Sequence, residues 1–505
     1  MTHRAPAGSS LRRVAAVAAL ATFAGHLLAN PHYGFFRDEL YFIVCGRHPA
    51  FGYVDQPPLV PLAAALSQIF GTSLFLVRAV AALAAAAAVY VCGLLAIELG
   101  GGAFAVVLTA ICVALAPVLA AFGAKLGTDT FMLWTWPLAA LFAVRATTGG
   151  DARWWIGAGV AIGIAAQSKY SVAFFAFALL AGLALTPQRS AFLTRGFWLG
   201  VAAAIAIALP NAAWQAAHGF PMLELLRNGQ HGKNVVLSPL DYLVSQLVLT
   251  GLLLALVWLA GLVWLAAGAN RRWLAIAYAI LLATMIALHA KDYYPAAIYP
   301  VLFAAGGVAI EAWTRRARVP RPLVAAVSIL CGLAFLPLVE PVLPVPTLIG
   351  YMHVLGGAPS SSEHHRMGAL PQDFADMHGW PELTQTVARV YASLSPAERS
   401  NVAIFASNYG EAGAIDVFGG AIGLPHAIAG HNSYYLWGPG AGDPRTVIDV
   451  NGRLAVDRTL CTSAVVAATV DAPYAMPYEQ GIPIIICRGL RAPLAQLWPR
   501  VKVYI

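Results

Sequence analysis

Charged side chains are scarce in this chain. Asp, Glu, Lys and Arg make up 11% of its 505 residues, whereas hydrophobic residues make up 59%. A soluble globular domain usually has about 25% charged and about 45–50% apolar residues. The mean hydropathy is +0.70. This composition excludes an ordinary soluble protein and predicts an integral membrane protein.

Several familiar site motifs are also missing. The sequence has no CxxC or HExxH pattern for a dedicated zinc site, no GxxxxGKS or GxxxxGKT loop for a nucleoside triphosphate, and no DxD pair for a metal-bound nucleotide. Among the six cysteines, Cys461 and Cys487 fall in the C-terminal region, where an oxidising compartment would permit a disulfide. The spacing does not decide whether these two cysteines pair.

Long apolar stretches are what the sequence does contain. Each of eleven stretches approaches the ~20 residues with which an α-helix crosses a bilayer. They are residues 14–30, 76–98, 103–122, 128–146, 153–168, 170–186, 195–214, 241–268, 272–288, 294–312 and 322–346. We therefore predict a polytopic α-helical membrane protein with about eleven transmembrane helices.

The arginines predict the orientation of these helices. If the first helix starts in the cytoplasm, the inner gaps hold most of the basic residues before position 350, which fits the tendency of Lys and Arg to stay on the cytoplasmic side. These residues are Arg4, Arg12, Arg13, Arg145, Arg153, Arg189, Arg195, Arg271, Arg272, Arg315, Arg316, Arg318 and Arg321. An odd number of spans then leaves the C-terminus outside. The net charge of +8 is explained by loops that meet anionic lipid, so no nucleic-acid partner is expected.

The C-terminal region has a different composition from the rest of the chain. Its apolar runs are short enough for strands, as at 401–406, 446–450, 464–470 and 482–487. Residues 380–394 carry apolar side chains at helical spacing. We predict two domains: a transmembrane catalytic domain at 1–349 and an extracytoplasmic α/β domain at 350–505. The polar stretch 359–378 is expected to be a linker or a mobile loop.

Acids, lysines and tyrosines gather at the predicted outer face. The first outer loop, 31–75, contains Tyr33-Gly-Phe-Phe-Arg-Asp-Glu-Leu40 and Gly52-Tyr-Val-Asp-Gln-Pro-Pro-Leu59. Asp129 and Lys169 follow at the ends of later spans, and His289-Ala-Lys-Asp-Tyr-Tyr-Pro295 opens the tenth. Taken singly, an outer acid is usually just solvated, a lysine at a helix end extends to the lipid head groups, and a tyrosine belongs to the interfacial belt. Their grouping on one face favours a site.

The chemistry of that face limits the reaction. Nucleotide sugars are absent outside the cytoplasmic membrane, so activated groups must arrive on lipid carriers. A polyprenyl-phosphate sugar leaves behind a phosphate, which needs cations more than a general acid. The acceptor hydroxyl needs a carboxylate that takes its proton as the anomeric carbon becomes oxocarbenium-like. One base and a cationic phosphate clamp therefore suffice.

Five short motifs carry a family resemblance: Arg37-Asp38-Glu39, Tyr53-Val-Asp55-Gln-Pro57-Pro58, Thr128-Asp129, Ser168-Lys169 and Lys291-Asp-Tyr-Tyr294-Pro295. In order and topology, over residues 30–310, they resemble the GT-C glycosyltransferases of the family 39 and protein O-mannosyltransferase type, which include bacterial aminoarabinose transferases of lipid A. The resemblance implies that Asp38 or Glu39 is the base and that Asp129 is a second acid. It implies a donor phosphate site made of Arg37, Lys169, Lys291, Tyr293 and Tyr294.

Two parts of the sequence leave alternatives open. Asp55-Gln56 stands where the aminoarabinose enzymes have Glu-Lys, so a lysine that would contact phosphate is lost. In the outer loop 215–240, His218, His231 and Lys233 could compensate, or the two histidines could bind a divalent metal with Asp55. The segments Asn408-Tyr-Gly-Glu-Ala-Gly413 and Gly430-His-Asn-Ser-Tyr-Tyr435 resemble C-terminal domains of some family 39 sequences; they either contact an acceptor glycan or form turns.

The sequence thus predicts an inverting, GT-C-like glycosyltransferase of the bacterial cytoplasmic membrane. It would move a sugar from a polyprenyl-phosphate donor to a glycan, lipid or protein acceptor at the outer face, with no certain cofactor. A transporter or flippase of a polyprenyl-linked glycan is the alternative, but it should show internal repeats and charges near mid-bilayer. A noncatalytic scaffold would leave the grouping of acids and lysines unexplained.

Overall fold

The structure is a computed structural model that describes residues 7–149, 151–232, 235–357, 359 and 363–505. It separates into two compact units, each assembled from three stretches of sequence. The first, here called the helical unit, comprises Met1–Pro31, Phe75–Ala213 and Val235–Pro344. The second, here called the α/β unit, comprises His32–Leu74, Trp214–Asn234 and Val345–Ile505.

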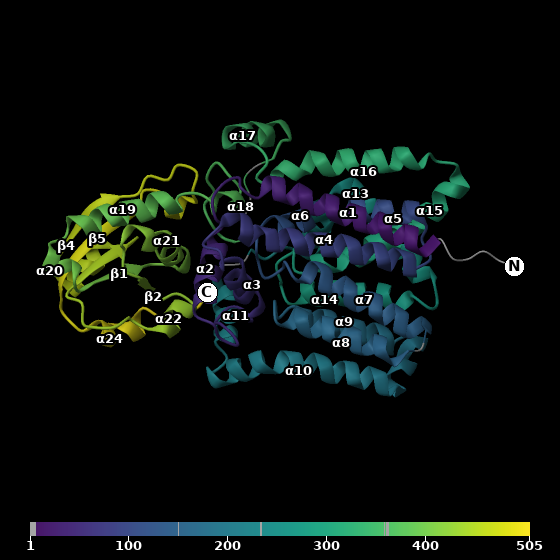
Figure 1. The fold of residues 1–505 in the computed structure, drawn as a ribbon, viewed down its shortest axis with the longest axis horizontal. Coiled ribbons are helices and arrows are strands. Elements are labelled where there is room, and N and C mark those ends of the chain that lie inside the picture. Colours follow the sequence, from purple (N-terminus) through teal and green to yellow (C-terminus); the bar gives the residue numbers. More distant parts are fainter. Residues whose placement is uncertain (1–6, 150, 233–234, 358, 360–362) are drawn as a thin grey trace. The chain divides into compact units, whose positions relative to one another are not determined.

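Helices make up the helical unit (Figure 1). They are α1 (Ala7–Ala29), α4 (Leu74–Glu98), α5 (Ala103–Leu115), α6 (Pro117–Ala124), α7 (Met132–Gly149), α8 (Ala152–Ala166), α9 (Val172–Ala184), η1 (Pro187–Leu193), α10 (Arg195–Ala217), α12 (Pro239–Thr250), α13 (Leu252–Ala267), α14 (Arg272–Ala287), η2 (Ala296–Ile298), α15 (Tyr299–Ala317), α16 (Arg321–Phe335) and η3 (Leu336–Leu338). Each of the eleven predicted apolar stretches overlaps at least one of them.

Length and composition allow five described helices to cross a membrane, or up to eight if each sharply bent pair forms one span. The bends have local causes. Pro117 cannot continue the hydrogen bonding of α5, so α6 starts there at 63° to it. Gly251 takes a φ of 82° between α12 and α13, which meet at 108°. The predicted total of eleven spans stays a prediction.

Glycine allows close helix contacts in the core of the helical unit. A Cβ added to Gly261 of α13 would lie 2.2 Å from the Leu302 carbonyl oxygen, and one added to Gly306 of α15 would lie 2.0 Å from that of Val257. These two helices therefore pack backbone to backbone. Small residues at such crossings are typical of membrane helices, which associate through close packing rather than through the hydrophobic effect.

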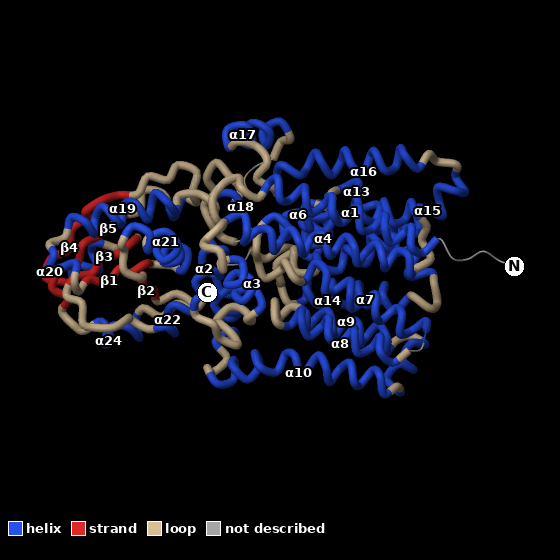
Figure 2. Tube along the Cα trace, viewed as in Figure 1, coloured by secondary structure: helices blue, strands red, loops and turns tan. Residues whose placement is uncertain are grey.

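The α/β unit contains the strands of the described chain (Figure 2). Its elements are α2 (Arg37–Arg47), α3 (Leu59–Ser67), α11 (Pro221–Gly232), α17 (Val345–Val354), α18 (Gln372–Ala375), α19 (Trp380–Ser393), α20 (Pro396–Arg399), β1 (Val402–Ala406), α21 (Tyr409–Phe418), η4 (Gly420–Ile422), β2 (Ala427–Ala429), α22 (Ser433–Trp437), β3 (Thr446–Val450), α23 (Leu454–Leu460), β4 (Cys461–Thr469), η5 (Pro477–Glu479), β5 (Pro483–Leu490), α24 (Leu494–Leu497) and η6 (Trp498–Arg500).

The sheet has the order β2-β1-β3-β5-β4. β1 runs parallel to β2 and β3, whereas β5 runs antiparallel to β3 and β4. From β1 the chain passes through α21 to β2 on one side, and then returns to β3 on the other side. The strand order therefore reverses at β1, and in open α/β sheets ligands bind at the carboxyl ends of strands beside such a reversal.

Both faces of the sheet are covered. α19 and α21 contact each other and the sheet, so they lie on the same face. Apolar residues of α19 at helical spacing, Leu383, Val387 and Val390, are buried there, which confirms the predicted amphipathic helix. On the other face, Leu460 of α23 and residues of α24 pack with the sheet residues Val447 and Cys487.

Two details of the C-terminal region go beyond the sequence. Cys461 and Cys487 form a disulfide between β4 and β5, with their Cα atoms 5.7 Å apart, which lies in the usual range. The expectation of a linker or mobile loop is wrong for residues 372–378. That stretch forms α18 and buries Phe374, Asp376 and Met377, because its apolar side chains have a surface to pack against.

Candidate functional site

Two of the predicted carboxylates stand at the start of α2 but have different environments. Glu39 is fully buried, and its Oε2 accepts a hydrogen bond from the Phe36 N–H at 2.9 Å, which satisfies a backbone donor at the helix start. Asp38 is about one third exposed, with 33% of its side-chain surface accessible. Of the two, Asp38 is the carboxylate that an incoming hydroxyl could reach.

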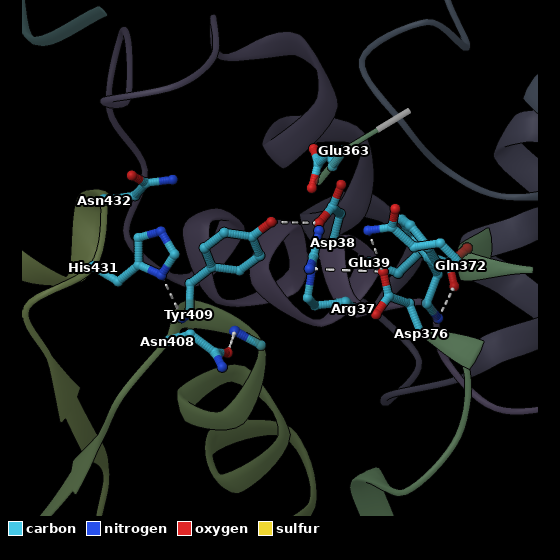
Figure 3. Close-up of polar contacts among 12 residues, drawn as sticks. Arg37, Asp38, Glu39, Glu363, Gln372, Asp376, Asn408, Tyr409, His431 and Asn432 are labelled. Carbon is cyan, nitrogen blue, oxygen red and sulfur yellow. Dashed lines mark hydrogen bonds and ion pairs between the residues drawn. The ribbon is translucent and has the colours of Figure 1, made fainter. Parts of the chain in front are cut away.

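Asp38 is held by one of its two oxygens. Tyr409 donates its hydroxyl to Asp38 Oδ1 at 2.8 Å, and Arg37 Nε lies 3.4 Å from the same atom. Figure 3 shows the Tyr409 hydroxyl pointing at this carboxylate. Within the described residues, Asp38 Oδ2 has no hydrogen-bond partner. That oxygen could therefore accept a proton.

Arg37 is engaged on several sides. Its Nη1 donates to the Tyr478 hydroxyl at 2.9 Å and lies 3.7 Å from Asp376 Oδ2. Tyr478 in turn donates to Asp376 Oδ1 at 3.2 Å. Burial raises the pKa of Asp376, and the charge of Arg37 opposes that rise. Within this unit the charge of Arg37 is paired with Asp38 and Asp376, so we expect Arg37 to orient Asp38. The role of Arg37 in donor binding stays a prediction.

Asp55 is linked to the C-terminal region through Tyr41 of α2. Tyr41 donates its hydroxyl to Asp55 Oδ1 at 2.9 Å, and the Ser433 N–H donates to that hydroxyl at 3.2 Å. Ser433 Oγ accepts from the N–H of Val54 at 3.2 Å. The two segments 408–413 and 430–435 thus reach the loop that carries the predicted acids.

The proposed metal ligands do not form a cluster among the described residues, which contain no group of three His, Cys, Asp or Glu side chains able to hold a metal ion. His218 stacks on Trp214 with ring centres 4.0 Å apart, and its Nδ1 lies 2.8 Å from the Trp214 carbonyl oxygen. The side chain of His231 and all of Lys233 lie outside the described residues. The metal hypothesis stays untested.

The helical unit brings together the remaining predicted residues. Lys169, in the turn between α8 and α9, places its Nζ 2.7 Å from Asp129 Oδ2. The same Nζ lies 4.5 Å from the ring centre of Tyr294 and 5.3 Å from that of Tyr293, which suits cation–π contacts. Lys291 Nζ lies 6.0 Å from the Tyr293 ring centre. The prediction did not foresee that Lys169 and Asp129 form an ion pair.

Hydrogen bonds to backbone carbonyls support the cluster in the helical unit, and one buried carboxylate oxygen of the cluster lacks a hydrogen-bond partner within the described residues. Ser168 Oγ donates to the Thr128 carbonyl at 2.7 Å, and Gln246 of α12 donates to the Asp292 carbonyl at 3.0 Å. Within the described residues, Asp129 Oδ1 is buried without a hydrogen-bond partner. A buried carboxylate oxygen in that state costs free energy. A donor group of a bound substrate would satisfy it.

A second pair of buried carboxylates lies where β1 and β3 end. Asn408 Nδ2 donates to Glu411 Oε1 and to Glu479 Oε1, both at 2.9 Å, so the two acids share one donor. Burial raises the pKa of Glu411 to about 7, and burial together with the Glu411 charge raises the pKa of Glu479 well above its usual value. The pair therefore retains a proton near neutral pH.

This pair predicts a pH dependence of stability. The pKa of Glu411 is higher in the folded protein, about 7, than its ordinary value of 4.5, so the folded state binds more protons between these values and the stability falls as pH rises through about 7. We expect the Tm of the full protein in detergent to fall on the order of a few °C between pH 5 and pH 8. Glu479→Gln should flatten that fall. Equal slopes in wild type and variant would show that the pair does not retain a proton.

The chain is similar to a known protein family and to solved structures. Residues 55–214 match a family model described as dolichyl-phosphate-mannose-protein mannosyltransferase. No curated protein matches the chain. The fold is similar to that of ArnT from Cupriavidus metallidurans bound to undecaprenyl phosphate, with a TM-score of 0.60 and 14% identity over 95% of this chain and 98% of ArnT.

Two further structures were found to be similar. ArnT in the apo state has a TM-score of 0.59 with 14% identity and covers 93% of this chain and 96% of its own. The Archaeoglobus fulgidus oligosaccharyltransferase tethered to an acceptor peptide has a TM-score of 0.45 and 14% identity, over 80% of this chain and 62% of that one. The predicted resemblance to GT-C glycosyltransferases, including the aminoarabinose transferases, is confirmed.

Proposed function

We propose that this protein is an inverting glycosyltransferase that moves a sugar from a polyprenyl-phosphate donor to an acceptor hydroxyl at the outer face of the bacterial cytoplasmic membrane. The observation that carries the proposal is the similarity of fold, along almost the whole chain, to a transferase whose structure holds undecaprenyl phosphate. Two polar clusters support it: the carboxylates around Asp38 in the α/β unit, and the lysines and tyrosines around Asp129 in the helical unit.

The two clusters receive different tasks in this proposal. Asp38 takes the proton of the acceptor hydroxyl on Oδ2 while that oxygen attacks the anomeric carbon from the face opposite the phosphate. Lys169 and Lys291 stabilise the negative charge that builds on the leaving polyprenyl phosphate, and the rings of Tyr293 and Tyr294 hold the Lys169 ammonium. Asp129 orients Lys169.

We further propose that the α/β unit lies outside the cytoplasm. The arginine-rich gaps support this orientation. So does the Cys461–Cys487 disulfide, because disulfides persist in oxidising compartments. The unit would then meet acceptors at the outer face.

The orientation predicts which introduced cysteines react in intact cells. Asp443 and Arg316 are both exposed, so each can be replaced by Cys without loss of a buried contact. An impermeant thiol reagent should label Asp443→Cys and leave Arg316→Cys unlabelled until the cells are opened. Labelling at 316 but not at 443 would reverse the orientation.

Transfer and transport give different products, so one experiment separates the proposed function from a flippase. The purified protein in nanodiscs would receive a mixture of radiolabelled polyprenyl-phosphate sugars and a cell-envelope extract as acceptor. A transferase releases free polyprenyl phosphate and moves the label to acceptor. A flippase would leave the sugar attached to its lipid. In sealed vesicles, it would only move that lipid from one side of the membrane to the other. Mass spectrometry of surface glycans in a deletion strain would then identify the acceptor.

A further inference from the structure

We propose that Tyr409, at the carboxyl end of strand β1, is a positioning residue that fixes the Asp38 carboxylate for proton transfer. The α/β fold of the C-terminal region would thereby form part of the catalytic site. This inference rests on the proposed function, in which Asp38 is the base. It assigns a role to a residue 371 positions away from Asp38 in the sequence.

The turn after β1 brings Tyr409 to this place. Asn408 caps α21, because its Oδ1 accepts from the N–H groups of Gly410 at 2.8 Å and Glu411 at 3.0 Å. Tyr409 is therefore the first residue of the helix, directly beyond the strand. It stands at the reversal of strand order, where α/β sheets present residues to ligands.

Glycines let α21 approach α2 closely enough for this contact. A Cβ added to Gly410 would lie 2.5 Å from Arg37 Cγ, and one added to Gly413 would lie 3.1 Å from Leu40 Cβ. Both glycines face α2, three residues apart on one side of the helix. The pattern Asn408-Tyr-Gly-Glu-Ala-Gly413 is thus explained by contact between two helices rather than by a turn alone.

The Tyr409 side chain has little freedom to move. The residue is 8% exposed, and its ring centre lies 4.7 Å from that of Tyr41 and 4.7 Å from that of His431. The Arg37 guanidinium carbon lies 5.4 Å from the ring centre. Burial raises the pKa of the Tyr409 phenol well above its ordinary value, so the hydroxyl stays a proton donor to Asp38. Figure 3 shows the ring between His431 and Asp38.

A carboxylate held in this way has one oxygen, Oδ2, that can accept a proton from the acceptor hydroxyl. Tyr409 and Arg37 both engage Oδ1, so rotation of the carboxylate about its own axis would break two hydrogen bonds. Oδ2 is then held in one orientation toward an acceptor hydroxyl. Since a misplacement of about 1 Å can lower the rate of an enzyme about 100-fold, loss of this hold should be visible in kcat.

The chain supplies a matched control for the test. Tyr434 donates its hydroxyl to Asp416 Oδ2 at 2.8 Å, and it is 3% exposed. This tyrosine–aspartate pair has the same chemistry and distance as the pair of Tyr409 and Asp38, and both tyrosines are buried, whereas Asp416 is less exposed than Asp38. Loss of either hydroxyl should therefore cost the fold a similar amount, typically about 1 kcal/mol or slightly more.

The test compares Tyr409→Phe with Tyr434→Phe in the full protein in nanodiscs, by turnover and by thermal unfolding. We expect Tyr409→Phe to lower kcat about 10- to 100-fold with the KM for donor within about twofold of wild type. Tyr434→Phe should lose a similar amount of Tm and keep its kcat. A wild-type kcat in Tyr409→Phe, or an equal loss of kcat in both variants, would overturn the proposal.

Asp38→Asn in the same assay separates this inference from the proposed function. If Asp38→Asn is inactive and Tyr409→Phe behaves like wild type, only the role of Tyr409 fails. If Asp38→Asn turns over normally, the assignment of the base fails, and the role of Tyr409 fails with it. If Asp38→Asn is inactive and Tyr409→Phe is slow, both assignments hold. The double variant should then be no slower than Asp38→Asn alone, because Tyr409 acts only through that carboxylate.

Discussion

Replacement of Asp38 with Asn is expected to lower kcat for sugar transfer by about 100- to 10,000-fold, the usual contribution of a general base. The carboxamide keeps the shape of the side chain, and its oxygen can still accept the Tyr409 hydroxyl. It cannot take a proton from the acceptor. Turnover of the purified variant, with Tm as the measure of folding, checks this result.

Glu39→Gln is the neighbouring control for that prediction. Glu39 is fully buried and accepts the Phe36 N–H, a bond that the amide oxygen of Gln can also accept. We expect this variant to keep most of its turnover and to lose little stability. An inactive Glu39→Gln beside an active Asp38→Asn would make Glu39 the base. Near-normal turnover in both variants would move the base elsewhere, with Asp129 the next candidate.

Lys169→Met is expected to have the second large effect, on both activity and stability. Loss of the ammonium removes a cation from the leaving phosphate, and loss of one such electrostatic contact typically costs about 100- to 1,000-fold in kcat. The substitution also removes the ammonium nitrogen that lies 2.7 Å from Asp129 Oδ2. An unpaired buried charge destabilises a protein by about 3–5 kcal/mol. Turnover, donor binding and Tm in nanodiscs report these effects separately.

The double variant Asp129→Asn/Lys169→Met separates the two roles of Lys169. With the acid neutralised, Tm should return most of the way to that of wild type, whereas turnover should stay low. Lys291→Met should lower turnover and donor binding without the loss of stability, and Lys125→Met, at the end of α6, should change neither. Activity that recovers together with Tm in the double variant would reduce Lys169 to a structural partner of Asp129.

The structure changes the interpretation of four residues that the sequence had grouped as acids or cations. Arg37 and Lys169 looked alike as donor-binding cations, yet both lie against acids, and the first hydrogen-bonds to Asp38. Asp38 and Glu39 are neighbours in sequence and differ in exposure, because α2 turns one toward the surface and the other into its own first turn. Spacing alone cannot distinguish the two, since the difference lies in what packs around the helix.

Tyr409 could have been suspected but not assigned. The segment around it attracts attention through its glycines and aromatic residue, which are equally typical of a turn. What distinguishes the two readings is the approach of Gly410 and Gly413 to α2, from a helix more than 360 residues away in the chain. No local pattern carries that information.

The sequence by itself determined the membrane class of the protein, the position of its apolar helices, the amphipathic helix of the C-terminal region and four of the five strands among the described residues. Hydrophobicity and its periodicity carry this information, because they act over a dozen residues. It also determined the order of the acids and lysines along the chain, and with it the resemblance to GT-C enzymes. Only the tertiary structure decided that Lys169 pairs with Asp129, that Cys461 pairs with Cys487, and that Tyr409 holds Asp38. Such pairs form where distant segments meet, and that meeting depends on the packing of whole helices and sheets rather than on the residues beside each partner.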